Sequence, residues 1–410
     1  MTATASPTSV DFAPHRLIPH RPAHRLLIHE PQAVEAIVAL LAQGLELIFA
    51  RVSDGKSIVR QDVNVPQPMQ DAQSYIGRLY LEEGKSEGAS ADLHGLIALC
   101  TFPLGAPEWG LDVFASEDCR YRDMVLVDPD LLVPTPECSV VAMSYNGFGE
   151  NQIVEKILFD TLTSLASRFK DREKAYSRLR ELLGRHSLIS ETHLVNYLNK
   201  HNMLSVQQDV SVQFYERLPQ AWLVDGMACS CPHCGTLMKP KKTGQEPRCT
   251  MVQCATTSFP DKPVLLDATS ERYLIAKPPV LKYWTEPAID ELRVYDTARQ
   301  LKIDDVRLYP YLDAVDISLL PGMEVGIDAK SYTTPEVLAM KFLQSGIGRL
   351  AQYKVRIVAI NDACVKGAPN YIGRLIDRLQ AAGDSNPAKG VHFMTVSDLL
   401  ERLPTYARSK

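Results

Sequence analysis

The chain has 410 residues, of which 45% are hydrophobic and 23% are charged, and its formal net charge is -5. This composition is ordinary for a folded protein of several domains, and it excludes a disordered or fibrous chain. The negative net charge excludes a protein-wide basic field, so any nucleic-acid site must be a local patch.

Residues 1–30 contain three His-Arg pairs and four prolines but no apolar core, which excludes a secretory signal. We expect these residues to form a flexible tail. The longest apolar stretch, residues 36–50, is interrupted by Gln43, Gly44 and Glu46. Because a membrane-spanning helix needs about 20 mostly apolar residues, we expect no membrane span.

Residues 31–150 begin with a helical pattern over 31–47. Three short apolar runs follow, HGLIALCTF, MVLVD and CSVVAMSY, and each is flanked by glycine, proline or aspartate. Such runs are typical of strands, so we predict an α/β or α+β domain of unknown role.

Residues 151–220 have a helical pattern. ENQIVEKILFDTLTSLASRF is amphipathic, a second helix lies near AYSRLRELLGRH, and a third begins after Ser190, a suitable N-cap. VSVQFYE then alternates like a strand, so the segment resembles a winged helix-turn-helix. Residues 168–185 carry seven basic residues against three acids, which fits either phosphate contact or a solvated helix face.

Five of the nine cysteines lie between Cys229 and Cys254. A disulfide framework would spread its cysteines along a small secreted chain, so one tight cluster indicates a metal site in a reducing, cytoplasmic environment. Four thiolates favour a closed, structural zinc site, and we predict a zinc ribbon over 225–262. The predicted ligands are Cys231, Cys234, Cys249 and Cys254, with Cys229 and His233 near enough to compete.

The segment 307–342 predicts a hairpin: YLDAVDISL as a strand, Pro321-Gly322 as a tight turn and MEVGIDAK as the returning strand. Side chains two apart share a face of a strand, so Asp328 and Lys330 point the same way, towards an acid of the first strand. Carboxylates brought together without a cation repel one another, whereas Mg²⁺ (or Mn²⁺) takes oxygen ligands of this kind. A metal held there polarises a phosphodiester, and Lys330 orients the attacking water.

The acid that joins Asp328 and Lys330 is either Asp316 or Asp313. These two residues are three apart, so on a regular strand they face opposite sides. The apolar alternation that follows Asp316 favours Asp316, and Asp313 is the alternate. The competing interpretation of the whole group is a solvated strand end.

Residues 280–410 predict the order αβββαβ, with a first helix over 287–300. This order and the residues Asp316 (or Asp313), Asp328 and Lys330 resemble the PD-(D/E)XK restriction-endonuclease-like superfamily, with Asp where many members have Glu. The leading helix of that superfamily often supplies another glutamate, and Glu291 or Glu286 matches it. The expected fold class is therefore a multidomain α/β protein with a restriction-endonuclease-like core at residues 280–410, after the ribbon and the winged-helix-like segment.

More narrowly, YPYLDAVDI…GIDAKSYTTPEVLA is similar to the nuclease associated with prokaryotic PIWI-RE modules, a likeness that covers about residues 170–410. It implies a metal-dependent endonuclease that hydrolyses DNA in anti-phage or anti-plasmid defence, beside a PIWI-like protein and a DinG-type helicase. The resemblance is also compatible with a homodimer. The alternative is a catalytically inactive scaffold with the nuclease fold, or a nucleic-acid-binding regulatory module.

Overall fold

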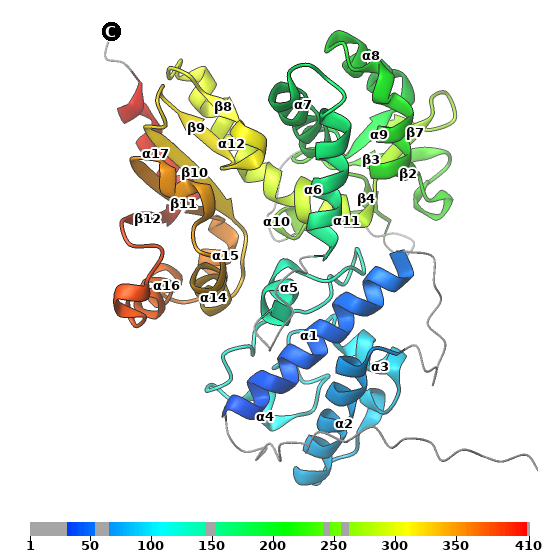
Figure 1. The fold of residues 1–410 in the computed structure, drawn as a ribbon. Helices are drawn as coiled ribbons and strands as arrows, with labels where there is room; N and C mark the ends of the chain where they lie inside the picture. Colours follow the sequence, from blue (N-terminus) through cyan, green and yellow to red (C-terminus); the bar gives the residue numbers. More distant parts are fainter. Residues whose placement is uncertain (1–30, 54–64, 144–152, 241–246, 256–261, 408–410) are drawn as a thin grey trace, which may run out of the picture.

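The computed structural model describes residues 31–53, 65–143, 153–240, 247–255 and 262–407, so the expected tail at 1–30 lies outside the described residues. The described residues form a mixed α/β protein in three groups of elements (Figure 1). One group is helical and N-terminal, one surrounds a small three-stranded sheet, and the C-terminal group is built on a five-stranded sheet.

The N-terminal group is helical, and the strands predicted for it are wrong. Its helices are α1 (Pro31–Ser53), α2 (Gln67–Glu82), α3 (Leu93–Leu99), α4 (Asp112–Ala115) and α5 (Pro136–Met143). HGLIALCTF contains α3, and CSVVAMSY contains most of α5. Every residue of α5 from Glu137 to Ala142 is buried. A helix buried on all sides shows no 3.6-residue period, so its apolar run could not be distinguished from a strand.

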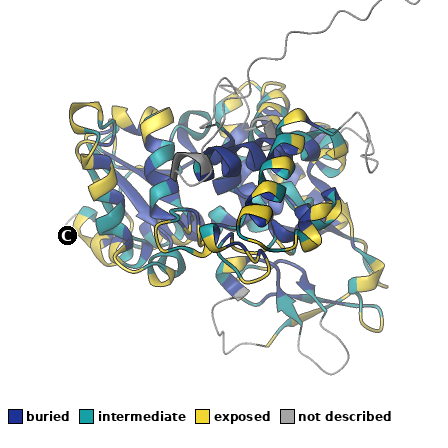
Figure 2. Cartoon of the chain, turned by 90° about the horizontal axis from the view of Figure 1, so that it is seen from below, coloured by how far each residue is buried: buried dark blue, intermediate teal, exposed yellow. Residues whose placement is uncertain are grey.

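Helix α1 contains a segment, Val34–Ser53, that is long and apolar enough to cross a membrane by length and composition alone. The three interruptions within it therefore do not by themselves exclude a span, and the absence of a membrane span stays a prediction. In this structure 67% of that window is buried inside the protein, as in the core helix of a globular domain. Figure 2 shows buried residues in the inner helices and strands and exposed residues on the outer turns of the helices. The buried hydrophobic residues form two core clusters.

The second group places helices around a sheet of strand order β1-β7-β2. Its elements are α6 (Ile153–Ala166), α7 (Arg172–Arg185), β1 (Leu188–Ser190), α8 (Glu191–Lys200), α9 (Gln207–Phe214), β2 (Tyr215–Arg217) and β7 (Tyr273–Ala276). The predicted N-cap is confirmed, because the hydroxyl of Ser190 accepts a hydrogen bond from the His193 amide at 3.1 Å. The predicted strand VSVQFYE is wrong up to Phe214. Val210 and Phe214 are buried four residues apart on a helix, while Val212 between them is 59% exposed.

The cysteine-rich segment is inserted between β2 and β7. It consists of β3 (Met227–Ser230), β4 (Met238–Lys239), β5 (Arg248–Cys249), α10 (Val252–Ala255) and β6 (Val264–Asp267). Strand β3 pairs with β6, and β4 pairs with β5, both antiparallel. The segment is therefore an insertion within the second group, because the chain returns to the same sheet at β7.

The C-terminal group has the strand order β12-β11-β10-β9-β8. Strands β10, β11 and β12 are parallel, whereas β8, β9 and β10 are antiparallel. Its elements are α11 (Pro278–Val280), the π-helical turn η4 (Leu281–Thr285), α12 (Glu286–Gln300), β8 (Arg307–Leu308), α13 (Pro310–Asp313), β9 (Ile317–Leu319), β10 (Val325–Lys330), α14 (Pro335–Ser345), β11 (Val355–Ile360), α15 (Asp362–Gly367), α16 (Tyr371–Gln380), β12 (Val391–Thr395) and α17 (Val396–Arg402).

Helices cover both faces of this sheet. On β11, Ile357 and Ala359 join the core that contains α12 and α17, and Val358 and Ile360 join the core that contains α14 and α16. The second core also contains residues of α1, α2 and α5, and α5 packs against α14. Strand β10 pairs with β9 and β11, so its acidic end belongs to the sheet between these helical layers.

Glu46 of α1 is a buried carboxyl whose titration links stability to pH. It is 3% exposed, and it accepts a hydrogen bond from Ser139 of α5. Burial raises the pKa of Glu46 from 4.5 to about 7, although the bond from Ser139 lowers it in part. The folded chain therefore holds this proton more tightly than the unfolded chain does. The resulting stability is fully present below pH 4.5 and is lost as the pH rises through 7.

We expect Glu46→Gln to raise the free energy of unfolding at pH 8 by about 3 kcal/mol, since each pKa unit corresponds to about 1.4 kcal/mol. At pH 4 the variant and the wild type should be equally stable. Urea unfolding at both pH values measures the difference, with the exposed Glu117→Gln as the control. An equal gain in the free energy of unfolding at pH 4 and pH 8 would contradict the raised pKa of Glu46.

Candidate active site

The hairpin of β9 and β10 brings two carboxylates together. Ile317 pairs with Ile327, so the antiparallel register places Asp316 opposite Asp328. The Oδ2 atom of Asp316 accepts a hydrogen bond from the Ala329 amide at 2.6 Å. The Nζ atom of Lys330 donates to Oδ1 of Asp328, also at 2.6 Å. Two carboxylates and one ammonium therefore converge at the end of one strand pair.

The electrostatics of this group differ between its two carboxyls, Asp316 and Asp328. Burial raises the pKa of Asp316 well above its ordinary value, and the carboxylates of Glu291 and Asp328 raise it further. Burial also acts to raise the pKa of Asp328, but the ammonium of Lys330 outweighs it and holds that pKa below its ordinary value. Lys330 thus stabilises the charged form of Asp328, and its weaker effect on Asp316 does not offset burial and the neighbouring carboxylates.

These residues line a cavity of about 570 Å³ between the sheet, α5, α6, α7 and α14. Its lining contains five carboxylates and three cationic side chains. The carboxylates belong to Glu155, Glu291, Asp313, Asp316 and Asp328, and the cations to Arg180, Lys330 and Lys341. The acidic side chains outnumber the basic ones by two, and burial together with repulsion between the acids raises the pKa values of Asp316 and Glu291. A divalent cation would relieve this repulsion in place of bound protons.

Asp313 does not lie on the strand, so the predicted strand over YLDAVDISL is wrong before Ile317. It ends the short helical turn α13, and Tyr309, Tyr311, Leu312 and Asp313 all have φ between 50° and 65°. Its carboxylate accepts a hydrogen bond from the hydroxyl of Tyr176 at 3.0 Å. The structure therefore turns Asp313 towards α7, while Asp316 lies beside Asp328.

The two glutamates proposed for the leading helix have different surroundings. Glu291 lines the cavity, is 2% exposed and accepts a hydrogen bond from the hydroxyl of Tyr309. Burial raises its pKa to about 7, against the lowering effect of Arg180. Glu286 instead accepts hydrogen bonds from the Val252 amide and from Lys282, at 2.8 and 2.9 Å. Of the two, Glu291 is the one placed at the carboxylate–lysine group.

The sequence did not assign three charged residues of the cavity to the site. They are Glu155, Arg180 and Lys341. Lys341 of α14 donates a hydrogen bond to the hydroxyl of Tyr332 at 3.0 Å. In the sequence, Arg180 stands out only as one member of a basic stretch. Its burial could have been predicted from its spacing, because it lies four residues after Tyr176 and three before Leu183, on the apolar face of α7.

The four predicted zinc ligands come together. One potential ligand atom from each of Cys231, Cys234, Cys249 and Cys254 lies within 4.8 Å of the others. Among the described residues this is the one cluster of three or more such groups. Cys229 is outside it, and Nδ1 of His233 lies 3.1 Å from Sγ of Cys254. All nine cysteines are free of disulfides, so four thiols are available for a tetrahedral metal site.

Helix α10 connects this cysteine cluster to the chain just after β10. Gln253, the neighbour of Cys254, donates a hydrogen bond to the hydroxyl of Ser331 at 3.1 Å. Ser331 directly follows Lys330 in the chain. A metal in the cluster would therefore hold in place a segment that touches the end of β10.

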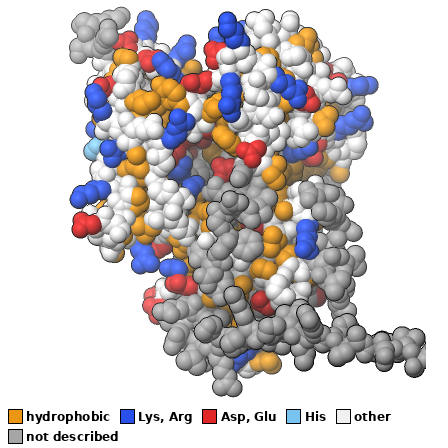
Figure 3. Space-filling view, in the orientation of Figure 1, with side chains coloured by type: hydrophobic (Ala, Val, Ile, Leu, Met, Phe, Trp, Pro, Cys, Tyr) orange, Lys and Arg blue, Asp and Glu red, His pale blue; other side chains and the backbone are white. Residues whose placement is uncertain are grey.

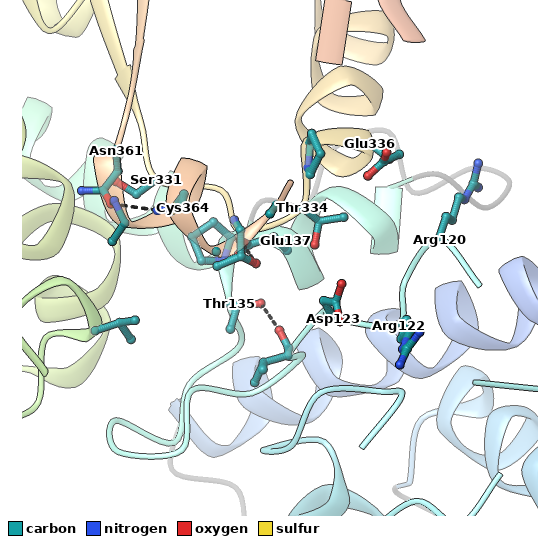
Figure 4. A pocket seen from close by; sticks show the side chains of 18 of the residues that line it. Arg120, Arg122, Asp123, Thr135, Glu137, Ser331, Thr334, Glu336, Asn361 and Cys364 are labelled. Carbon is teal, nitrogen blue, oxygen red and sulfur yellow. Dashed lines mark hydrogen bonds between the residues drawn. The ribbon is translucent and has the colours of Figure 1, made fainter. Parts of the chain in front are cut away.

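A larger cavity of about 1120 Å³ adjoins the first, and the two share Pro136, Pro287 and Ser331 in their lining. Figure 4 shows Arg122 and Asp123 on one side of it and Thr334 and Glu336 on the other. Seven acidic and four basic residues line it. This excess of acids makes it a poor site for a nucleic acid.

Fold and site together define a mixed α/β protein with a four-cysteine cluster and a carboxylate–lysine group on its largest sheet. Residues 288–409 match the family model described as "REase associating with pPIWI_RE". The narrower resemblance stated from the sequence is confirmed for this segment, and the family name indicates a nuclease-like role in pPIWI-RE systems. No curated protein and no solved structure matches the chain. The match begins within α12, so α7 and the cysteine cluster lie outside it.

We expect purified protein to contain about one zinc ion per chain, because four thiolates form a closed tetrahedral site. Cys231→Ser should bring the zinc content close to zero and lower the melting temperature, whereas Cys229→Ser should retain the metal. Elemental analysis and thermal melting of both variants measure these effects. Equal zinc loss in the two variants would contradict the assigned ligand set.

Proposed function

We propose that this protein is a metal-dependent endonuclease that hydrolyses DNA phosphodiester bonds. The observation that carries the proposal is the placement of Asp316 opposite Asp328, with Lys330 on the same strand end, in a cavity whose acidic side chains outnumber its basic ones. The family match over 288–409 supports it, because the matched family is named for restriction endonucleases.

The carboxylates of Asp316 and Asp328 would hold Mg²⁺ or Mn²⁺, since both ions take oxygen ligands. Two protein ligands leave coordination positions for water and for substrate phosphate, as Mg²⁺ prefers. When bound, the cation supplies Lewis-acid polarisation of the phosphodiester and offsets negative charge in the transition state.

The protein side chains perform the remaining steps. Lys330, held by Asp328, orients the attacking water and stabilises the charge that develops on the phosphate oxygens. Hydrolysis forms one bond from the water oxygen to phosphorus and breaks one ester bond. The water gives up a proton, and the leaving oxygen takes one. Glu291, whose pKa of about 7 leaves both protonation states populated near neutrality, is suited to exchange that proton.

The family name implies association with a pPIWI_RE protein. The helicase, the DNA target and the cellular setting come from the resemblance stated from the sequence and belong to the proposal. The enzyme would act in the cytoplasm of a prokaryote, beside a PIWI-like protein and a DinG-type helicase, against phage or plasmid DNA. On the face shown in Figure 3, lysine and arginine side chains are interspersed with acidic and hydrophobic ones. DNA would therefore contact dispersed basic residues and the cavity. Such phosphate contacts predict that DNA binding weakens as the salt concentration rises.

The rival function is a scaffold with the nuclease fold that binds nucleic acid without cutting it. The hydrogen bond between Gln253 of α10 and Ser331 fits a structural role of the strand end as well as a catalytic one. The two functions differ in their metal requirement, because a scaffold binds equally well in the presence of a chelator.

We expect the wild type to nick supercoiled plasmid or cut single-stranded circular DNA with Mg²⁺ or Mn²⁺, and to lose this activity in EDTA. Lys330→Met should lower the cleavage rate by about 10²–10³-fold, because it removes a cation aimed at the developing charge. Gel assays with both substrates measure the rates. Cleavage that persists in Lys330→Met or in EDTA would contradict the proposal.

A second comparison separates the two candidate acids. Asp316→Asn should abolish Mn²⁺ binding at the hairpin, because it replaces a carboxylate that faces Asp328. Asp313→Asn should retain Mn²⁺ binding, because Asp313 is turned towards Tyr176 and Arg180. Calorimetric titration of zinc-loaded protein measures the binding, and the reverse order of effects would assign the metal to Asp313.

A further inference from the structure

The guanidinium of Arg180 is built into the active-site cavity. The residue is 3% exposed, and its carbon Cζ lies 5.0 Å from the ring centre of Trp284 and 4.7 Å from that of Tyr309. Stacking against two aromatic rings fixes the plane of the guanidinium, so its N–H groups point in set directions.

Part of this guanidinium has no hydrogen-bond partner. Its Nη1 donates to the backbone oxygen of Trp284 at 3.1 Å. Its Nε is buried without a hydrogen-bond partner among the described residues. The carboxylates of Glu291 and Asp313 lie 3.7 Å away, which is an ion-pair distance but too long for a hydrogen bond. Leaving a charged donor unsatisfied is costly, so its retention in a polar cavity calls for a ligand.

Helix α7 is also attached to the loop that precedes the catalytic strand. The hydroxyl of Tyr176 donates to Asp313, and the hydroxyl of Ser177 donates to the backbone oxygen of Tyr309 at 3.1 Å. The carboxylate of Glu173 accepts from the Tyr311 amide at 2.9 Å. These bonds hold the stretch of positive φ angles against α7. The position of Arg180 relative to the hairpin is therefore defined.

We propose that Arg180 binds a non-bridging oxygen of the scissile phosphate, so that the active site is completed by a helix outside the family-matched segment. The ligand class is a phosphodiester, for which a guanidinium fork is the most suitable protein donor. This inference rests on the proposed nuclease function. It adds that residues 288–409 alone contain an incomplete site.

The experiment compares Arg180→Lys and Arg180→Gln with the wild type in the full-length, zinc-loaded protein. The control is Arg185→Gln, because Arg185 lies on the same helix, is bound to Asp296 at 2.6 Å and does not line the cavity. Arg180→Lys keeps the positive charge between Glu291 and Asp313, so it protects the fold, but it loses the fork. Thermal melting and zinc content report folding for every variant.

In single-turnover cleavage we expect Arg180→Lys to be about 10²-fold slower, because a preorganised donor at the developing charge is lost. Arg185→Gln should stay within about threefold of the wild type. If Arg180 only neutralises its neighbours, Arg180→Lys will cleave at the wild-type rate, and the proposal is overturned.

A binding measurement tests the same contact without catalysis. With Ca²⁺ in place of Mg²⁺, a labelled oligonucleotide is titrated at several salt concentrations. Arg180→Gln should lower the slope of log affinity against log salt by about 0.7 for a single strand, the loss of one phosphate contact. An unchanged slope overturns the inference. A wild type that binds with the expected slope but never cuts contradicts the proposed function and leaves the phosphate contact supported.

Discussion

The antiparallel register of β9 and β10 is the constraint on which the site depends. Because Ile317 pairs with Ile327, Asp316 and Asp328 meet across the strand pair, next to Lys330. A slip of one residue would send Asp316 to the opposite face of the sheet. The register therefore holds two carboxyls close together in a partly desolvated cavity, where burial and their repulsion raise the pKa of Asp316. This repulsion is the physical reason that the site suits a divalent cation.

Helix α7 supplies the second constraint. Consecutive left-handed residues cost about 1–2 kcal/mol each, so the segment from Tyr311 to Asp313 persists only because other contacts hold it. Those contacts come from α7, which also carries Arg180 into the cavity. The helix and this segment lie far apart in the sequence, yet hydrogen bonds from α7 reach Tyr309, Tyr311 and Asp313. The family-matched segment is therefore packed against a helix that lies outside it.

The zinc-type cluster has a comparable place in the structure. Its ligands lie on an insertion between β2 and β7, and its last helix, α10, reaches the chain just after Lys330 through Gln253 and Ser331. A closed four-thiolate site contributes folding energy to a small segment that has little apolar core of its own. A metal in the cluster would thus also stabilise the end of β10.

The sequence by itself determined the features that depend on local spacing. The knuckle around Cys231 and Cys234, the N-cap at Ser190, and the shared face of Asp328 and Lys330 each follow from neighbours within a few residues. Periodicity failed where burial removed its signal, as in α5, and where a chance alternation imitated a strand, as in α9. Only the tertiary structure decided that Asp316 lies beside Asp328 and Asp313 does not, because the backbone leaves the strand conformation before Ile317. It alone also decided that Arg180 enters the cavity, since burial of a charge depends on partners more than a hundred residues away.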